Sequence, residues 1–417
     1  MSEQENRVTD VSVVVAFVPG ITGSELYSAE FGRKYPQEKR PGTTGQIWPH
    51  LARLEDIEEW PEIYACVSAL EGGLGEVTPG AIVRTVPRDP PDKVYQDLIT
   101  FFTAAPPSGR GFQSCTYAQD RIPGNGNLFF MIPYDWRLDN SRSSSYLGKA
   151  LDALDLAYGG ATGHPGKYSL FLVAHSMGGL ICRHLLESSP SVKTRNWFSN
   201  LQNLITLATP HLGTPQALGA ITDQIRDASW LFSSYIAHFA DNKEFPSIYQ
   251  LLPPPQIPFV NDSDNNKRYS IYNGPVHDLL LATYPLLGFG ANAENFVAAE
   301  NFFRCLSYDT RSEGVATPVP YNCFAGTQLK TADAFLYNSG WAPVPRPSDR
   351  LYPKYEDTAG DGTVPESSAV YLPLQGVSVR RFPHKNHLEM SYDPDVMNAI
   401  ADILDRPRAQ RARVVSA

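Results

Sequence analysis

One stretch of the sequence decides the fold: Leu172-Val173-Ala174-His175-Ser176-Met177-Gly178-Gly179-Leu180. Residues 168–173 are apolar enough to form a strand inside a parallel sheet, and residues 180–187 have a helical pattern. Ser176 lies between them, beside a glycine pair, in the arrangement called the nucleophile elbow and usually written G-x-S-x-G. The sharp turn points the serine hydroxyl out of the sheet and needs small neighbours, here Ala174 and Gly178.

The elbow has an alternative interpretation, in which a strand and a helix pack together without any chemistry. His175 is next to the serine, but neighbouring side chains on such a turn point in different directions. We therefore interpret His175 as a positioned histidine and not as a second base. The N-terminus of the helix that follows would favour a developing negative charge through its free N–H groups.

The composition argues against several classes of protein. The chain has 417 residues, a net charge of −9 and a pI of about 5.5, without a basic stripe, so we expect no nucleic-acid partner. Five cysteines are too few and too scattered for a disulfide framework or a zinc site, and the nine histidines are not spaced as metal ligands. We therefore expect no metal and no cofactor.

The two ends of the sequence bear on where the protein is found. Residues 1–10 are polar and lack the charged and apolar regions of a signal peptide. No run reaches the ~18 apolar residues of a membrane-spanning helix. These features predict a cytoplasmic protein. Residues 406–417 carry four arginines, and we expect a disordered tail there.

Apolar runs predict further strands of the same sheet, at residues 11–18, 127–132, 201–207, 319–325 and 376–382. Helical patterns fall between or after them, at residues 94–102, 145–158 and 394–404. This alternation predicts an α/β fold with a mostly parallel sheet flanked by helices. We expect one core, made of residues 11–214 and 318–405.

Two segments break this rhythm. Residues 25–90 are rich in proline, glycine and charge, and they predict an irregular, lid-like excursion. Residues 215–317 carry leucine and aromatic residues at helical spacing, which predicts a large, mostly helical cap. A cap of this size above the serine would enclose an apolar pocket.

A glycine-bearing loop, residues 19–24, follows the first strand directly. In hydrolases with a nucleophile elbow, such a loop supplies half of the oxyanion hole through its backbone N–H groups. We predict the N–H of Ile21 as one donor and the N–H of Met177, the residue after the serine, as the other. An ordinary turn from strand to loop is the alternative explanation of these glycines.

A carboxylate and a histidine follow the serine in the order Ser…Asp…His, which is the chain order of α/β-hydrolases. Asp361 lies in a Gly-Asp-Gly loop, and His387 lies between the last strand and the closing helix. The histidine would take the serine proton and return it to the leaving group, while the aspartate would stabilise the imidazolium. Asp357 and His384 are the competing residues.

The remaining candidates concern the substrate pocket. The loop at residues 208–215 follows a strand at the same edge of the sheet as the elbow, where parallel α/β sheets bind ligands. We predict five pocket residues: Thr22, Trp48, His211, Leu212 and Trp230. Asp135 and Arg137, which lie beside aromatic residues, predict a packed ion pair with a structural role.

Motifs along most of the chain resemble the lecithin:cholesterol acyltransferase family, which includes lysosomal phospholipase A2. They run in the family's order and are Val18-Pro19-Gly20-Ile21-Thr22-Gly23-Ser24, Ile47-Trp48, Pro133-Tyr134-Asp135-Trp136-Arg137, Val173-Ala174-His175-Ser176-Met177-Gly178, Ala325-Gly326-Thr327, Gly360-Asp361-Gly362-Thr363-Val364 and His387-Leu388-Glu389-Met390. One loop, residues 208–215, departs from the family's Ala-Pro-Trp-Gly-Gly and is nearer to bacterial-type lipases.

The resemblance implies an α/β-hydrolase with a cap that acts on acyl esters of lipids. It also implies that Ser176, Asp361 and His387 form a catalytic triad and that Ile21 and Met177 form the oxyanion hole. An acyl-enzyme of this kind can pass its acyl group to water or to an alcohol.

We predict a serine esterase or lipase that cleaves a small-molecule or lipid ester through an acyl-Ser176 intermediate. An O-acyltransferase that moves the acyl group to an alcohol is the first alternative. A catalytically inactive binding protein on a hydrolase scaffold is an alternative of another class, and a peptidase, amidase or thioesterase is a third. Peripheral contact with a membrane and the oligomeric state stay open at this point.

Overall fold

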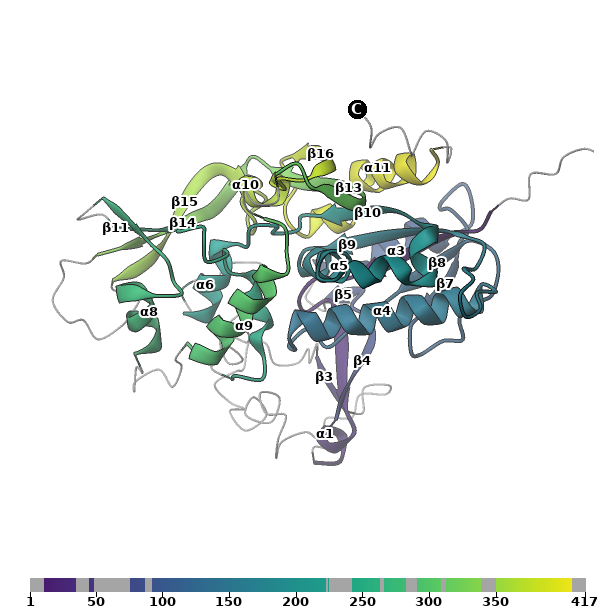
Figure 1. Cartoon of the computed structure of the whole chain (residues 1–417), viewed down its shortest axis with the longest axis horizontal. Coiled ribbons are helices and arrows are strands. Elements are labelled where there is room, and N and C mark those ends of the chain that lie inside the picture. The colour runs from purple at the N-terminus through teal and green to yellow at the C-terminus, as the bar shows by residue number, and fades with distance from the viewer. Residues whose placement is uncertain are drawn as a thin grey trace, which may run out of the picture.

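The computed structural model describes residues 11–34, 45–48, 76–86, 92–222, 224, 242–262, 266–282, 291–308, 313–338 and 350–406. Within these residues, seven strands form one parallel sheet in the order β16-β13-β10-β9-β1-β8-β7 (Figure 1). They are β1 (Val13–Val18), β7 (Gln113–Thr116), β8 (Leu128–Met131), β9 (Ser169–His175), β10 (Leu201–Leu207), β13 (Ala316–Thr327) and β16 (Gln375–Pro383). The predicted α/β fold is confirmed.

The central strands β1 and β9 set the position of the elbow. Every residue of β9 is buried, as expected of a strand inside a parallel sheet that is covered on both faces. Val18 of β1 pairs with Ala174 of β9, and Leu207 of β10 pairs with His175. The three strands therefore end side by side, and the loops that follow them meet at one edge of the sheet.

Two helices of the core, α4 (Asn140–Ala157) and α11 (Pro394–Leu404), begin at side-chain caps. Asp139 accepts the N–H of Ser141 at the start of α4, and Asp393 caps α11 in the same way. α4 begins at residue 140 instead of the predicted 145, because its first turn is polar and has no apolar periodicity. α5 (Met177–Glu187) packs on β9, α4 packs on α5, and α3 (Gln96–Thr103) packs on β8.

Shorter elements complete the core: β5 (Thr85–Val86), β6 (Asp92–Lys93), η3 (Pro190–Thr194), η4 (Asn196–Asn200), α10 (Glu366–Val370) and η9 (Glu389–Ser391). β5 and β6 pair with each other as a small antiparallel ribbon. Among the helices that the structure describes, none is both long and apolar enough to cross a membrane.

The segment predicted as a helical cap contains strands as well as helices. Its described elements are α6 (Pro215–Ile221), η6 (Pro246–Leu251), β11 (Val260–Asp262), β12 (Lys267–Tyr269), α8 (Gly274–Leu281) and α9 (Ala293–Arg304). β11 and β12 join β14 (Leu329–Tyr337) and β15 (Leu351–Gly360) in a second sheet of order β12-β11-β14-β15. This sheet crosses the predicted boundary at residue 317. β11 and β12 have three residues each, too few for a clear local pattern, and β11 pairs with the distant β14 as well as with β12.

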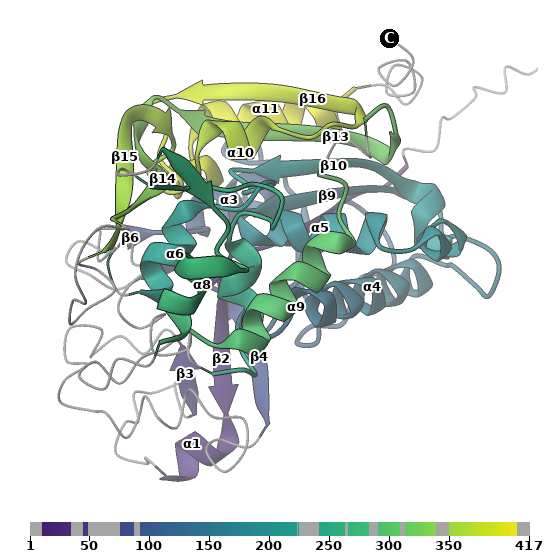
Figure 2. The ribbon, with the colours of Figure 1, turned by 60° about the vertical axis from the view of Figure 1, so that its left-hand side comes forward.

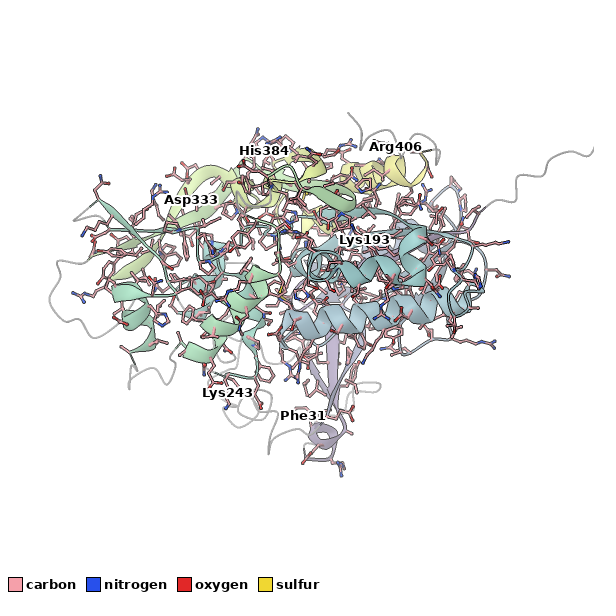
Figure 3. The ribbon with its side chains drawn as sticks, in the orientation of Figure 1. Phe31, Lys193, Lys243, Asp333, His384 and Arg406 are labelled. Carbon is pink, nitrogen blue, oxygen red and sulfur yellow. The ribbon has the colours of Figure 1, made fainter. Side chains whose placement is uncertain are left out.

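Residues 25–90, which are predicted to form an irregular excursion, contain some regular secondary structure. β2 (Ser24–Ser28), β3 (Gln46–Trp48) and β4 (Val77–Ile82) form a small antiparallel sheet, with α1 (Ala29–Lys34) after β2. This sheet projects away from the central sheet (Figures 1 and 2), and Phe31 marks its far end (Figure 3). Residues 49–75 of this excursion lie outside the described part of the chain.

A buried ion pair joins the elbow helix to the segment after α9. The Arg183 Nε atom lies 2.8 Å from Glu187 Oε1, and the two side chains are 0% and 4% exposed. Arg183 also donates to the Ser307 carbonyl at 2.8 Å, and the Ser307 N–H donates to Glu187 at 2.8 Å. Tyr321 of β13 donates to the same carboxylate. These added hydrogen bonds offset part of the cost of removing both charges from water.

Replacing Arg183 with leucine should lower the free energy of unfolding by about 3–5 kcal/mol, because the Glu187 carboxylate stays buried without its counter-charge. Urea denaturation measures this loss. Arg195→Leu is the matched control, since Arg195 and Asp152 form an ion pair whose side chains are 52% and 40% exposed. Its loss should stay within about 1 kcal/mol, and equal losses for the two variants would contradict the argument.

Candidate active site

Ser176 stands at the turn between β9 and α5 in a strained backbone conformation. Its φ is 52° and its ψ is −126°, in a region that residues other than glycine seldom adopt. The Ser176 N–H donates to the carbonyl of Leu207 on the neighbouring strand at 2.8 Å, which holds the turn against the sheet. The serine thus lies where the sequence predicts a nucleophile elbow, at the carboxyl edge of the sheet.

Three predicted residues form one hydrogen-bonded row. The Ser176 Oγ lies 2.9 Å from His387 Nε2, and His387 Nδ1 lies 2.8 Å from Asp361 Oδ2. The carboxylate can only accept, so Nδ1 carries a proton toward it and Nε2 is left to accept the serine hydroxyl. All three side chains are buried, with Ser176 4%, His387 2% and Asp361 1% exposed. This order of donors allows the imidazole to receive the serine proton.

The Gly-Asp-Gly loop holds the carboxylate in place. Asp361 Oδ1 accepts the N–H groups of Thr363 at 2.9 Å and Val364 at 2.7 Å, which leaves Oδ2 for the histidine. The His387 N–H also donates to the Asp361 carbonyl at 3.0 Å, so the acid and the base are joined through their backbones as well. The competing residues, Asp357 and His384, are exposed, and Figure 3 marks His384 on the surface.

The loop after β1 approaches the serine closely. A Cβ atom at Gly20 would lie 2.9 Å from Ser176 Cβ, and one at Gly178 would lie 2.5 Å from the carbonyl oxygens of Val18 and Pro19. Only glycine fits at these two positions without displacing the backbone. Ile21 follows directly in this loop, and neither its N–H nor that of Met177 meets an acceptor within the described residues.

The predicted pocket residue Thr22 belongs to this loop, and the predicted pocket residue Trp48 contacts it. Trp48 Nε1 donates to the Thr22 carbonyl at 2.7 Å, and both residues are almost fully buried. The Trp48 ring packs edge-on against Trp136 at 5.5 Å, and the Tyr134 hydroxyl donates to the Pro19 carbonyl at 3.0 Å. These contacts support the loop, and the side chains of Thr22 and Trp48 are 0% and 1% exposed.

The neighbouring Asp135 and Arg137 form the predicted ion pair. Arg137 Nη2 lies 2.7 Å from Asp135 Oδ2, both side chains are buried, and the guanidinium lies 4.6 Å from the Phe245 ring centre. The pair therefore connects the motif around Trp136 to the residues before η6. These contacts fit the structural role that the sequence predicts for the pair.

His211 is fully buried, and both of its ring nitrogens have protein neighbours. Nε2 lies 3.2 Å from Thr206 Oγ1, and Nδ1 lies 3.4 Å from an Arg183 nitrogen. Burial and the Arg183 charge lower the pKa of His211. This departs from the expectation of a pocket residue, because packing occupies the whole side chain. Leu212 is half-buried, and its N–H donates to Ser368; Trp230 lies outside the described residues.

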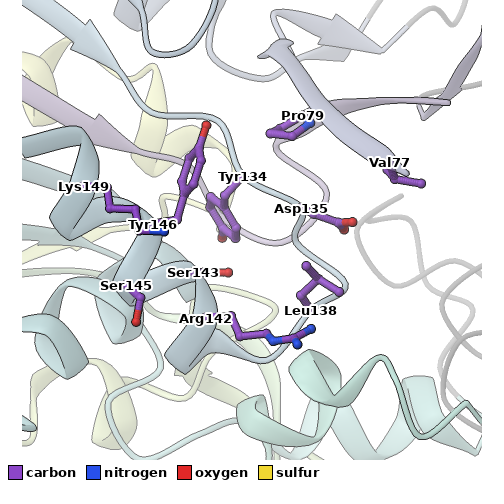
Figure 4. A pocket seen from close by; sticks show the side chains of 10 residues that line it. All are labelled: Val77, Pro79, Tyr134, Asp135, Leu138, Arg142, Ser143, Ser145, Tyr146 and Lys149. Atoms are coloured by element: carbon purple, nitrogen blue, oxygen red, sulfur yellow. The ribbon is translucent and has the colours of Figure 1, made fainter. Parts of the chain in front are cut away.

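A second candidate ligand site is a pocket of about 430 Å³ beside the start of α4 (Figure 4). Tyr134, Leu138 and Tyr146 contribute its apolar surface, while Arg142 and Lys149 border it from α4. No member of the hydrogen-bonded row lines this pocket. Across the described ranges, no three His, Cys, Asp or Glu side chains are grouped in a way that could hold a metal ion.

His175 has contacts that the sequence did not reveal. Its Nδ1 lies 2.8 Å from the Tyr95 hydroxyl, and its Nε2 lies 2.9 Å from the carbonyl oxygen of His387. Burial, together with the nearby His387 ring, lowers the pKa of His175 to about 3. No signal in the sequence links Tyr95 to His175, because the two residues come from separate segments.

The comparisons with known proteins agree with this geometry. Residues 124–279 match the protein family described as "Lecithin:cholesterol acyltransferase", and they include the elbow and the motif around Trp136. Residues 124–279 of the chain are therefore similar to the lecithin:cholesterol acyltransferase family. This confirms the resemblance carried by the motifs.

Two curated members of this family illustrate the relationship. The chain is 25% identical over 288 residues to "Phospholipase A(1) LCAT3" of Arabidopsis thaliana, with 61% of this chain and 60% of that protein covered. It is 26% identical over 276 residues to "Lysosomal phospholipase A and acyltransferase" of Bos taurus, with 62% and 58% covered. The chain therefore spans about three fifths of the length of these relatives.

A solved structure supports the fold. A chain in the crystal structure of the Tle4–Tli4 complex matches with a TM-score of 0.54 at 13% identity, covering 94% of this chain and 98% of that one. At this identity the likeness concerns the fold alone.

The buried His175 should make stability depend on pH. Its pKa of about 3 in the folded protein is below the ordinary value of 6.5, so the unfolded chain binds a proton in this window and the folded protein does not. The free energy of unfolding should therefore fall as the pH falls from 6.5 toward 3, by about 1.4 kcal/mol per pH unit. Denaturation of wild type and His175→Gln at several pH values measures this, and parallel profiles would refute it.

Proposed function

We propose that this protein is a serine hydrolase that cleaves carboxylic esters of lipids through an acyl-Ser176 intermediate. The observation that carries the proposal is the buried row Ser176–His387–Asp361, with hydrogen bonds of 2.9 and 2.8 Å. A row with this order of donors converts a weakly nucleophilic hydroxyl into an effective nucleophile.

The reaction proceeds in two halves. Ser176 Oγ attacks the ester carbonyl while His387 Nε2 takes its proton, and the imidazolium is stabilised by Asp361. The N–H groups of Ile21 and Met177 donate to the oxyanion, since both adjoin residues at the serine and have no other acceptor in the described structure. His387 then returns the proton to the leaving alcohol. In the second half, water gives a proton to His387 Nε2 and attacks the acyl carbonyl. The bond to Ser176 Oγ then breaks, His387 returns the proton to Oγ, and the acid leaves.

Lipid acyl esters are the substrate class that the family favours. Two relatives carry the words phospholipase A in their names, and the names fit a substrate with long acyl chains. We assign the segment 215–317, together with β14 and β15, to a cap over the acyl chain. We assign half-buried Leu212, in the loop before this segment, to the pocket. The proposal includes peripheral contact with a membrane, where such esters are found, and a cytoplasmic location.

Acyl transfer to an alcohol is the second candidate function. The name of the bovine relative includes the word acyltransferase. Water and an alcohol attack the same acyl-enzyme, so the two reactions differ only in the nucleophile that the pocket retains.

The roles of the three residues lead to a direct test. Ser176→Ala, His387→Ala and Asp361→Asn should each lower kcat for p-nitrophenyl esters by about 10⁴-fold or more, because each removes a member of one unit. A fluorophosphonate probe should label wild type and not Ser176→Ala. His384→Asn and Asp357→Asn are matched controls at exposed positions and should retain activity. Loss of activity in these controls, or labelling of Ser176→Ala, would refute the assignment.

The substrate class needs a separate measurement. Rates on p-nitrophenyl esters from two to sixteen carbons should rise toward long chains, and phospholipid vesicles should release fatty acid in a Ser176-dependent manner. A lipid alcohol added to the vesicles tests transfer, since an acylated alcohol would appear beside the free acid. Activity restricted to short esters would reject the lipid assignment while leaving the triad in place.

A further inference from the structure

We infer that Tyr95 and His175 are positioning residues, which hold the loop after β1 and the histidine of the triad in fixed register through one buried chain of hydrogen bonds. The inference rests on the proposed function, because it concerns the same reaction. Three contacts form the chain: Gly20 N to Tyr95 Oη at 2.9 Å, Tyr95 Oη to His175 Nδ1 at 2.8 Å, and His175 Nε2 to the His387 carbonyl at 2.9 Å.

The two ends of the chain determine every donor within it. The Gly20 N–H can only donate, so the Tyr95 oxygen accepts this bond and uses its own proton to donate to His175 Nδ1. Nδ1 is therefore unprotonated, and the proton of the neutral ring is on Nε2. This N–H donates to the His387 carbonyl, which can only accept. A single tautomer of His175 thus satisfies all four polar groups.

Burial makes each bond of this chain of hydrogen bonds costly to lose. Tyr95 and His175 are each 1% exposed, and the Tyr95 ring packs edge-on against Phe17 at 5.0 Å and against His175 at 5.6 Å. Water cannot replace a lost partner at such a depth, so a broken bond leaves a polar group unsatisfied. The lowered pKa keeps His175 neutral, which the chain requires, since a proton on Nδ1 would face the Tyr95 donor.

The chain of hydrogen bonds ends at Gly20 and at His387, and the reaction requires a fixed position of one relative to the other. Gly20 precedes Ile21, the proposed oxyanion donor, and touches Ser176. His387 carries the base, and its carbonyl is the final acceptor. The Ser391 Oγ atom adds a second contact, since it lies 2.7 Å from the Val94 carbonyl and 2.7 Å from the Leu388 carbonyl and so joins the segment of Tyr95 to the segment of His387. Misplacement by about 1 Å of a reacting group can lower a rate by ~10²-fold.

The first variant for the test is Tyr95→Phe, which removes only the hydroxyl. We expect kcat to fall by about 10- to 100-fold with KM nearly unchanged, because binding of the ester is retained while its reacting groups are misaligned. Tyr168→Phe is the matched control. Tyr168 is also 1% exposed and donates to Asp155 at 3.1 Å, and it lies at the opposite end of β9 from Ser176. The control should lose stability and retain kcat.

Variants of His175 test the other half of the chain. His175→Gln keeps an N–H that reaches the former position of Nε2, whereas His175→Leu has no polar atom. The glutamine variant should retain several-fold more kcat than the leucine variant. The combined fall in Tyr95→Phe/His175→Leu should be smaller than the product of the single falls, because both changes break one chain.

The outcomes separate this inference from the proposed function. Wild type without Ser176-dependent ester hydrolysis would refute the proposed function itself. The positioning role would be overturned if wild type is active and Tyr95→Phe and His175→Leu retain its kcat, losing only stability as Tyr168→Phe does. Nitrogen NMR of the wild-type histidines gives a check that needs no variant. It should show His175 as the neutral Nε2–H tautomer, and a proton on Nδ1 would overturn the chain of donors.

Discussion

The close contact between Gly20 and Ser176 is the constraint on which the rest of the site depends. A side chain at Gly20 would collide with Ser176, and one at Gly178 would collide with the end of β1. The loop after β1 can therefore lie directly on the elbow, provided that β1 and β9 end at the same level of the sheet, as their register ensures. The strained φ of Ser176 is tolerated because β10 anchors its N–H.

Features with a local signal could be predicted from the sequence. The strands of the central sheet are continuous apolar runs, and the elbow combines such a run with small residues at defined spacing. The order of serine, aspartate and histidine identified three residues that the fold brings into hydrogen-bond contact. The choice of Asp361 over Asp357, and of His387 over His384, depends on which side chain the loops turn inward. The burial of the first of each pair supplies this information.

Features that depend on distant partners could not be predicted. β11 has three residues and is a strand because β14 pairs with it. His211 was expected at the pocket from its loop, yet Arg183 on α5 and Thr206 on β10 enclose it. Tyr95 begins an ordinary amphipathic helix in the sequence, and its importance arises from a contact with His175 that only the folded chain creates.

The second sheet also limits how this architecture can vary. β11 and β12 come before β13 in the chain, β14 and β15 come after it, and β11 pairs directly with β14. The chain thus passes through the central sheet between the two halves of one smaller sheet. Excision of β11 and β12 alone would therefore expose the edge of β14. The two halves of this sheet, although separated in the sequence by β13, therefore depend on each other for pairing.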